Sequence, residues 1–212
     1  DLVEKVCAKI KAFYGDDAEA RRRSADYCQI VNARHFERVK ALLDNAVALG
    51  ARVHSGGVCH AESRFIDPAV LTQIPEAADI WTEEIFGPLL PVRPYRTLDD
   101  AIAYINSKPR PLSLYLFSGR KKVVRKIQTE TRFGGGTVND CGVHFYQVNL
   151  PFGGVNNSGL GQCHGEAGFL DFSNSCGMTT QNRIFPHTNL FLPPYGKSRL
   201  VKWMLEGVVR WF

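Results

Sequence analysis

Between residues 89 and 138 the sequence alternates short apolar runs with segments of helical period. The apolar runs have the length of β-strands and cover Leu89–Tyr95, Leu112–Phe117 and Gly135–Val138. The segments between them begin near Thr97 and Ser118 and place apolar residues three or four positions apart. Strands that alternate with amphipathic helices are typical of a parallel sheet covered by helices. The fold class is therefore predicted as α/β with a buried parallel sheet.

The first part of the chain adds helices to this pattern. Apolar residues recur at helical spacing over residues 2–14, and a second helix is predicted between Asn32, a candidate N-cap, and Gly50. The polar and basic residues 15–30 predict a loop. A further apolar run is interrupted by Asp67-Pro68. It is predicted as a strand end or an edge strand, because proline has no N–H for the ladder.

Composition excludes several classes of protein. No apolar run reaches the roughly 18 residues of a membrane-spanning helix. The net charge of +5 is mild, and the clusters Arg21-Arg22-Arg23 and Arg120-Lys121-Lys122 lack interleaved aromatic residues, so no nucleic-acid partner is expected. Six cysteines in 212 residues are too few for a disulfide scaffold and indicate a reducing compartment. We therefore expect a cytoplasmic protein.

The hexapeptide Glu83–Pro88 is the most informative short segment. Two acidic residues precede an aromatic residue, and Gly-Pro then forces a turn. A carboxylate can accept hydrogen bonds from both hydroxyls of a ribose, and an aromatic ring can pack against a nicotinamide. The alternative is a surface turn that carries an incidental pair of acids, and the residues alone leave both interpretations open.

The glycine-rich segment Pro151–Gly161 is a second candidate. Gly159, Gly161 and Gly165 have the spacing G-x-G-x-x-x-G, which is one residue too long for a dinucleotide fingerprint, and no predicted strand precedes them. We therefore expect a tight loop at a substrate entrance or a subunit contact. No metal is expected, because the Cys-His pairs lie far apart and structural zinc sites use paired ligands.

Several motifs that occur in a fixed order carry a family resemblance. They are Glu83–Pro88, Pro109–Ser118, Gly135–Asp140, Pro151–Gly161 and His164–Ser173. In this order and spacing the chain resembles the aldehyde dehydrogenase superfamily over about residues 1–183. It is most similar to the class 3 or fatty aldehyde branch. The resemblance implies the C-terminal half of that family's catalytic domain.

The resemblance also assigns roles to individual residues. Glu84 matches the family residue that binds the ribose next to the nicotinamide, and Phe86 matches the aromatic residue that contacts the nicotinamide ring. Asn139 and Asp140 match positions that line the substrate funnel, and Ser173–Arg183 matches the oligomerisation strand. The implied cofactor is NAD or NADP, and the implied partners are an aldehyde substrate and further copies of the chain in a homo-oligomer.

The family's attacking cysteine, in a Gly-Gln-x-Cys motif, and its water-activating glutamate lie upstream of the segment that begins at Asp1. The segment Gly161-Gln162-Cys163 lacks the intervening residue and follows the glycine-rich loop, so Cys163 is not assigned as the nucleophile. Helical spacing starts at the first residues of the chain. We therefore expect this chain to be the C-terminal part of a longer protein. The chain itself is expected to contain no catalytic residue and to be inactive alone.

Three segments are expected. They are a partial catalytic domain (1–172), an oligomerisation strand with a linker (173–196) and an amphipathic helical tail (197–212). Apolar and aromatic residues of the tail share one helical face and basic residues occupy the other, which suits a membrane surface. A helix that docks on a neighbouring subunit is the alternative for the tail.

Two other classes of function remain open for the whole chain. One is a non-catalytic oligomerisation module that binds full-length subunits. The other is a peripheral membrane protein whose tail is its main functional part.

Overall fold

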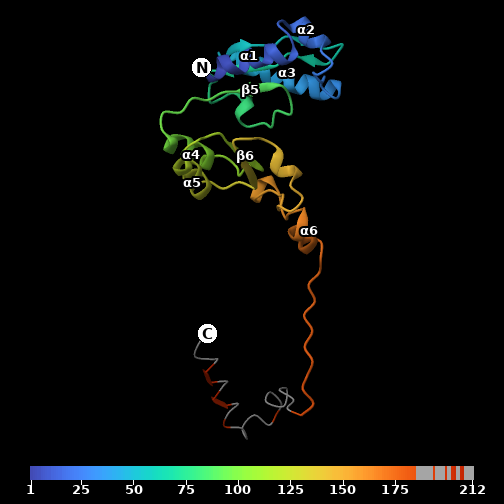
Figure 1. Ribbon diagram of the computed structural model, residues 1–212, viewed down its shortest axis with the longest axis vertical. Helices are drawn as coiled ribbons and strands as arrows, with labels where there is room; N and C mark the ends of the chain where they lie inside the picture. The colour runs from blue at the N-terminus through green and yellow to red at the C-terminus, as the bar shows by residue number, and fades with distance from the viewer. Residues whose placement is uncertain (185–192, 194–198, 200–201, 204–205, 208–212) are drawn as a thin grey trace. The chain divides into compact units, whose positions relative to one another are not determined.

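The computed structural model describes residues 1–184 and, in the C-terminal segment, residues 193, 199, 202–203 and 206–207 (Figure 1). The chain divides into two compact units, Asp1–Ala103 and Tyr104–Phe212. Residues 1–172, expected as one partial domain, are divided between these units. The expected boundaries at residues 172 and 196 stay predictions.

The first unit contains a small mixed sheet with helices. Its helices are α1 (Leu2–Tyr14), α2 (Ala18–Arg23), α3 (Ala33–Ala48) and the 3-10 helix η1 (Asp79–Trp81). Its strands are β1 (Arg52–Ser55), β2 (Cys59–His60), β3 (Phe65–Ile66), β4 (Ala69–Thr72) and β5 (Leu89–Pro91). The two helices predicted from the apolar spacing are confirmed. Asn32 caps α3 by accepting a hydrogen bond of 2.9 Å from the backbone N–H of His35.

The sheet of the first unit has the order β1-β4-β5. Strands β4 and β5 are parallel, whereas β1 is antiparallel to β4 and β2 is antiparallel to β3. Of the two alternatives predicted for Asp67-Pro68, the strand end is confirmed, since these residues lie between the end of β3 and the start of β4. The edge strand was wrong, because β4 is the central strand. Pro68 precedes β4, so its missing N–H does not interrupt the ladder.

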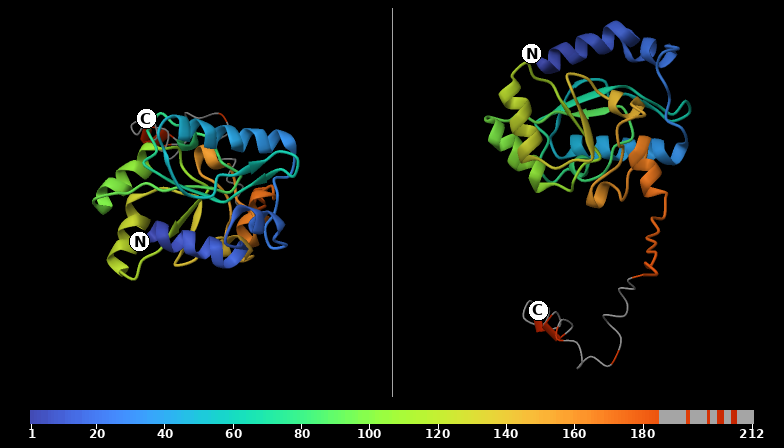
Figure 2. Two further views of the ribbon diagram at one scale, coloured as in Figure 1. Left: turned by 90° about the horizontal axis from the view of Figure 1, so that it is seen from above. Right: turned by 60° about the horizontal axis from the view of Figure 1, so that its bottom comes forward.

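The core of the first unit lies between α3 and one face of this sheet. The helix buries Phe36, Val39, Leu42, Leu43 and Ala46, and these residues pack with Ala69 and Leu71 of β4 and Leu89 of β5. Figure 2 shows α1 and α3 on opposite sides of the sheet. Helix α1 buries none of its residues fully. The face covered by α3 therefore supplies most of the apolar burial.

Helix α2 lies where a loop was predicted. Asp17 caps it with a carboxylate that accepts a hydrogen bond of 2.8 Å from the N–H of Ala20. Arg21 of this helix is buried, and its Nε and Nη2 donate to the two carboxylate oxygens of Asp67 at 2.6 and 2.9 Å. The loop prediction failed because a partner 46 positions away stabilises a basic segment that looks solvated in the sequence.

The second unit contains a two-stranded parallel sheet. Its elements include α4 (Leu98–Ser107), which spans the unit boundary, β6 (Ser113–Leu116), α5 (Lys121–Glu130) and β7 (Gly135–Val138). They also include the 3-10 helices η2 (Val143–Tyr146) and η3 (Asn156–Ser158) and the short helix α6 (Gly165–Asp171). The β6–β7 pairing confirms the predicted strand–helix–strand unit, with Ser113 opposite Gly135 and Leu116 opposite Val138.

Two further predictions about the sheet were wrong. The described strands form three separate sheets, of which one is mixed, one antiparallel and one parallel, and not one parallel sheet. The strands of the second unit are also not buried, since Tyr115 of β6 is 42% exposed and Val138 of β7 is 39% exposed. Burial on both faces of a strand needs covering elements that this part of the chain does not supply.

The C-terminal segment differs from its predicted form. Residues 173–183 are exposed and contain no strand in the single chain. Pairing of this segment with another subunit stays a prediction. The expected amphipathic tail at 197–212 lies mostly outside the described residues. None of the described helices is both long enough and apolar enough to cross a lipid bilayer.

Candidate functional site

The hexapeptide Glu83–Pro88 forms the loop between η1 and β5 and is anchored at both ends. Before it, the N–H of Asp79 donates to Oδ1 of Asn45 on α3 at 3.1 Å. After it, the carbonyl of Pro88 accepts from the N–H of Ala69 at 2.9 Å, and the chain enters β5. The loop is therefore fixed to both the helix and the central strand of the first unit.

Arg38 on α3 holds the middle of this loop. Its Nη1 donates to the carbonyl oxygen of Glu84 at 2.8 Å and its Nη2 to that of Ile85 at 2.6 Å. The carboxylate of Glu83 lies 3.9 Å from Nη1 of the same guanidinium. Hydrogen bonds from a charged donor are stronger than neutral ones. One side chain thus fixes two consecutive peptide units of the loop.

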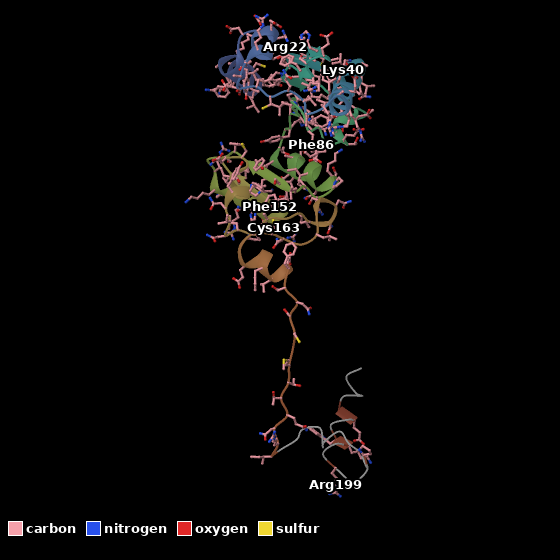
Figure 3. All side chains as sticks on the ribbon, turned by 90° about the vertical axis from the view of Figure 1, so that its right-hand side faces the viewer. Arg22, Lys40, Phe86, Phe152, Cys163 and Arg199 are labelled. Atoms are coloured by element: carbon pink, nitrogen blue, oxygen red, sulfur yellow. The ribbon has the colours of Figure 1, made fainter. Side chains whose placement is uncertain are left out.

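The loop directs two predicted cofactor residues toward solvent. Phe86 has a positive φ of 43°, and its side chain is 74% exposed (Figure 3). Glu84 is also exposed, whereas Ile85 between them is partly buried against the core. Gly87 is required here, because a Cβ at this position would lie 2.7 Å from Cγ1 of Val39. The structure therefore places Glu84 and Phe86 on one constrained loop.

Asn139 directly follows β7 and joins the ends of the two parallel strands. Its N–H donates to the carbonyl of Leu116 at 2.7 Å. Its side-chain Oδ1 accepts from the N–H of Ser118 at 2.8 Å, and its Nδ2 donates to the Ser118 carbonyl at 3.2 Å. Its φ is 60°, a conformation that Asn tolerates better than most residues. The amide of Asn139 is therefore engaged with the backbone.

Replacing Asn139 with alanine is expected to lower the free energy of unfolding by about 1–3 kcal/mol. The change removes both hydrogen bonds to Ser118 and leaves an unfavourable φ. Urea unfolding of the wild-type protein and the variant measures the difference. The control is Asp140→Ala, which removes one exposed hydrogen bond of 2.8 Å to the N–H of Cys141 and should cost at most about 0.5 kcal/mol. Equal stabilities of the two variants would contradict the structural role of Asn139.

The glycine-rich segment and α6 surround a cleft of about 630 Å³. Its lining is mostly apolar side chains and glycine backbone and includes Leu112, Phe152, Gly154, Leu160, Cys163 and Phe172. Phe152 and Cys163 lie next to each other and pair through their backbones (Figure 3). Gly154 cannot be replaced without rearrangement, because a Cβ would lie 2.1 Å from the carbonyl oxygen of Ser158. The segment is a tight loop, as predicted.

The predicted site residues form two separate groups. Glu84 and Phe86 share a loop of the first unit, and Asn139 and Asp140 follow β7 of the second unit. Sequence reasoning missed Arg38, because an arginine on an amphipathic helix gives no sign of its carbonyl partners. It also missed that His144 is buried and links the two strands of the second unit. Its ring nitrogens lie 3.2 Å from Ser113 Oγ and 3.4 Å from Thr137 Oγ1.

The described part of the chain thus has α/β architecture, and its ordered motifs resemble those of the aldehyde dehydrogenase superfamily. Comparison with known protein families supports this resemblance. The model of the "Aldehyde dehydrogenase family" matches residues 1–176, and the chain belongs to that family.

Individual relatives support the class 3 branch. The chain is 45% identical over 172 residues to "Aldehyde dehydrogenase, dimeric NADP-preferring" of Rattus norvegicus, a match that covers 81% of this chain and 36% of the relative. It is 40% identical over 172 residues to "Aldehyde dehydrogenase family 3 member A2" of the same species, covering 81% and 34%. The chain thus spans about a third of the length of these relatives.

A solved structure shares the fold. It is described as the "Substrate bound state of Staphylococcus Aureus AldH", and it aligns with a TM-score of 0.75 and 36% identity. The alignment covers 97% of this chain and 43% of that chain. The α/β aldehyde dehydrogenase fold is therefore shown for this region.

Proposed function

We propose that this chain is the cofactor-facing and substrate-facing C-terminal part of an NAD(P)-dependent dehydrogenase that oxidises an aldehyde to a carboxylic acid. The observation that carries the proposal is the loop Glu83–Pro88, whose backbone is held by Arg38 while Glu84 and Phe86 are exposed. A surface turn with incidental acids does not require hydrogen bonds from an arginine that lies 46 positions away in the sequence.

The loop fits a nicotinamide nucleotide. The carboxylate of Glu84 accepts hydrogen bonds from the ribose hydroxyls, and the ring of Phe86 packs against the nicotinamide. When bound, the cofactor supplies a hydride acceptor. Because the loop is fixed before binding, little conformational entropy is lost when the nucleotide is ordered. The NADP-preferring relative supports NADP as one of the two cofactors.

The substrate is an apolar aldehyde of medium or long chain, or an aromatic aldehyde. Asn139 and Asp140 line part of its path, with Asn139 acting through the backbone that it holds. The dimeric relative supports a homo-oligomer, to which residues 173–183 contribute an intermolecular strand. The thiolate that attacks the aldehyde and the carboxylate that activates water come from outside these 212 residues, so the chain by itself is inactive.

The proposed compartment is the cytoplasm. All six cysteines lie in the described part of the chain, and none forms a disulfide bond. Free thiols are typical of a reducing compartment.

The test compares two neighbouring acids in the full-length protein. Glu84→Gln is expected to lower kcat/KM for NAD(P) by about 10–100-fold, because a charged hydrogen-bond acceptor to the ribose is lost. Glu83→Gln is the matched control and should change kcat/KM by less than about twofold, since the exposed Glu83 carboxylate makes only a long contact of 3.9 Å with Arg38. Steady-state kinetics with varied cofactor measures both. Equal effects of the two substitutions would refute the assignment of Glu84.

A further inference from the structure

The first half of α5 carries a concentrated positive charge that the dehydrogenase function leaves unexplained. Five of the seven residues 120–126 are cations, namely Arg120, Lys121, Lys122, Arg125 and Lys126. The first turn contains no acidic residue. Cations near a helix N-terminus oppose the helix dipole and do not stabilise the helix. An acid appears only at Glu130, 3.9 Å from the Lys126 amine.

The packing of α5 fixes this basic face toward solvent. Ile127 is buried, and Val123 and Val124 are partly buried, so the apolar side of the helix is turned inward. Lys121, Lys122 and Arg125 are exposed. Helix α5 lies beside α4 (Figures 1 and 2), and Asn106 Nδ2 donates to the carbonyl of Glu130 at 2.7 Å.

An exposed aromatic residue lies in the loop that leads into α5. Phe117 is 67% exposed and directly precedes Ser118. The loop is held at Ser118, whose backbone makes two hydrogen bonds with the amide of Asn139 and whose Oγ accepts from the N–H of Arg120 at 3.1 Å. The chain therefore presents one aromatic ring and a group of cations from a constrained segment.

We propose that the basic face of α5, together with Phe117, docks on an anionic lipid bilayer. Lysine and arginine are attracted to the negative headgroups, and the aromatic ring enters the interface between headgroups and acyl chains. A bilayer presents diffuse charge and requires no shape complementarity from a convex helix. A nucleic-acid strand requires a groove with several stacking residues, and this face offers a single exposed ring.

The docking face is continuous with the predicted substrate path. The loop at Ser118 is bonded directly to Asn139. Apolar aldehydes partition into membranes, so docking here brings their source next to the residues that line the path. This consequence rests on the proposed function, whereas membrane docking itself does not.

The experiment is flotation of the full-length protein with phosphatidylcholine vesicles, with and without phosphatidylserine. The variant Lys121→Gln/Lys122→Gln/Arg125→Gln removes three cations, each worth about fivefold, so partition onto anionic vesicles should fall roughly a hundredfold. The control Lys5→Gln/Lys9→Gln/Lys11→Gln removes three exposed cations from α1 and should leave partition within about twofold. The single variant Lys122→Gln gives an expected loss of about fivefold should the triple variant fold poorly.

Two further variants separate alternatives. Phe117→Ser is expected to weaken binding to anionic vesicles without changing its dependence on salt. Trp203→Ser tests the tail, since Trp203 is 72% exposed there. Equal binding of vesicles by the wild type and the α5 triple variant would overturn the proposal. A loss of binding in Trp203→Ser but in none of the α5 variants would also overturn it. Binding to duplex DNA or to an acidic polypeptide without flotation would also overturn it. Because flotation needs no turnover, its outcome is independent of dehydrogenase activity.

Discussion

Replacing Asp67 with alanine is expected to lower the free energy of unfolding by about 3–5 kcal/mol. The Arg21 and Asp67 side chains are 6% and 1% exposed and form a bidentate pair. Removing the carboxylate leaves a guanidinium buried without its counter-charge. The hydrogen bond from Nη1 of Arg21 to the carbonyl of Gly15, at 3.0 Å, supplies no negative charge. The pair also ties α2 to the segment that enters the central strand β4.

The effect is measured by urea unfolding against two controls. Glu19→Gln breaks partly exposed ion pairs to Arg22 and Arg23 and should cost no more than about 1 kcal/mol. The double variant Arg21→Leu/Asp67→Ala removes both charges and should recover much of the loss, because no unpaired charge remains. If Asp67→Ala is as stable as Glu19→Gln, the buried pair does not stabilise the fold.

Arg38→Gln is the functional change with the largest expected effect, and it rests on the proposed function. The substitution removes both charged hydrogen bonds to the loop carbonyls of Glu84 and Ile85. A displacement of about 1 Å in a positioned group can cost about 100-fold in rate. We therefore expect kcat/KM to fall by about 100-fold, with a smaller change in overall stability, since the loop is exposed.

Kinetics and unfolding midpoints of the full-length protein distinguish this role from a general loss of structure. Arg38→Lys should recover little activity, because an ammonium group cannot reproduce the planar two-point donation. Arg22→Gln, which breaks a partly exposed pair with Glu19, should leave kcat/KM unchanged. If Arg38→Gln loses activity only in proportion to its loss of stability, the proposed role of Arg38 in positioning the loop is contradicted.

Local signals predicted the regular elements because those elements depend on neighbouring residues. The spacing of apolar residues over 33–48 gave α3, and Asn32 caps it as expected. The helical segment predicted to begin near Thr97 forms α4, and Thr97 and Asp100 cap it with reciprocal hydrogen bonds of 3.0 and 3.2 Å. The ordered motifs from Glu83 to Ser173 likewise identified the family from local residue order alone.

The tertiary structure decided what depends on distant partners. Helix α2 forms with its arginine paired to Asp67, and β4 is central because β1 and β5 pair on its two sides. The loop that carries Glu84 and Phe86 is constrained by Arg38, and the amide of Asn139 is engaged with Ser118. In each case the deciding contact joins residues at least 15 positions apart. The spacing of apolar residues and the capping patterns depend on residues within one or two helical turns. They therefore do not indicate which distant residues will pair in the fold.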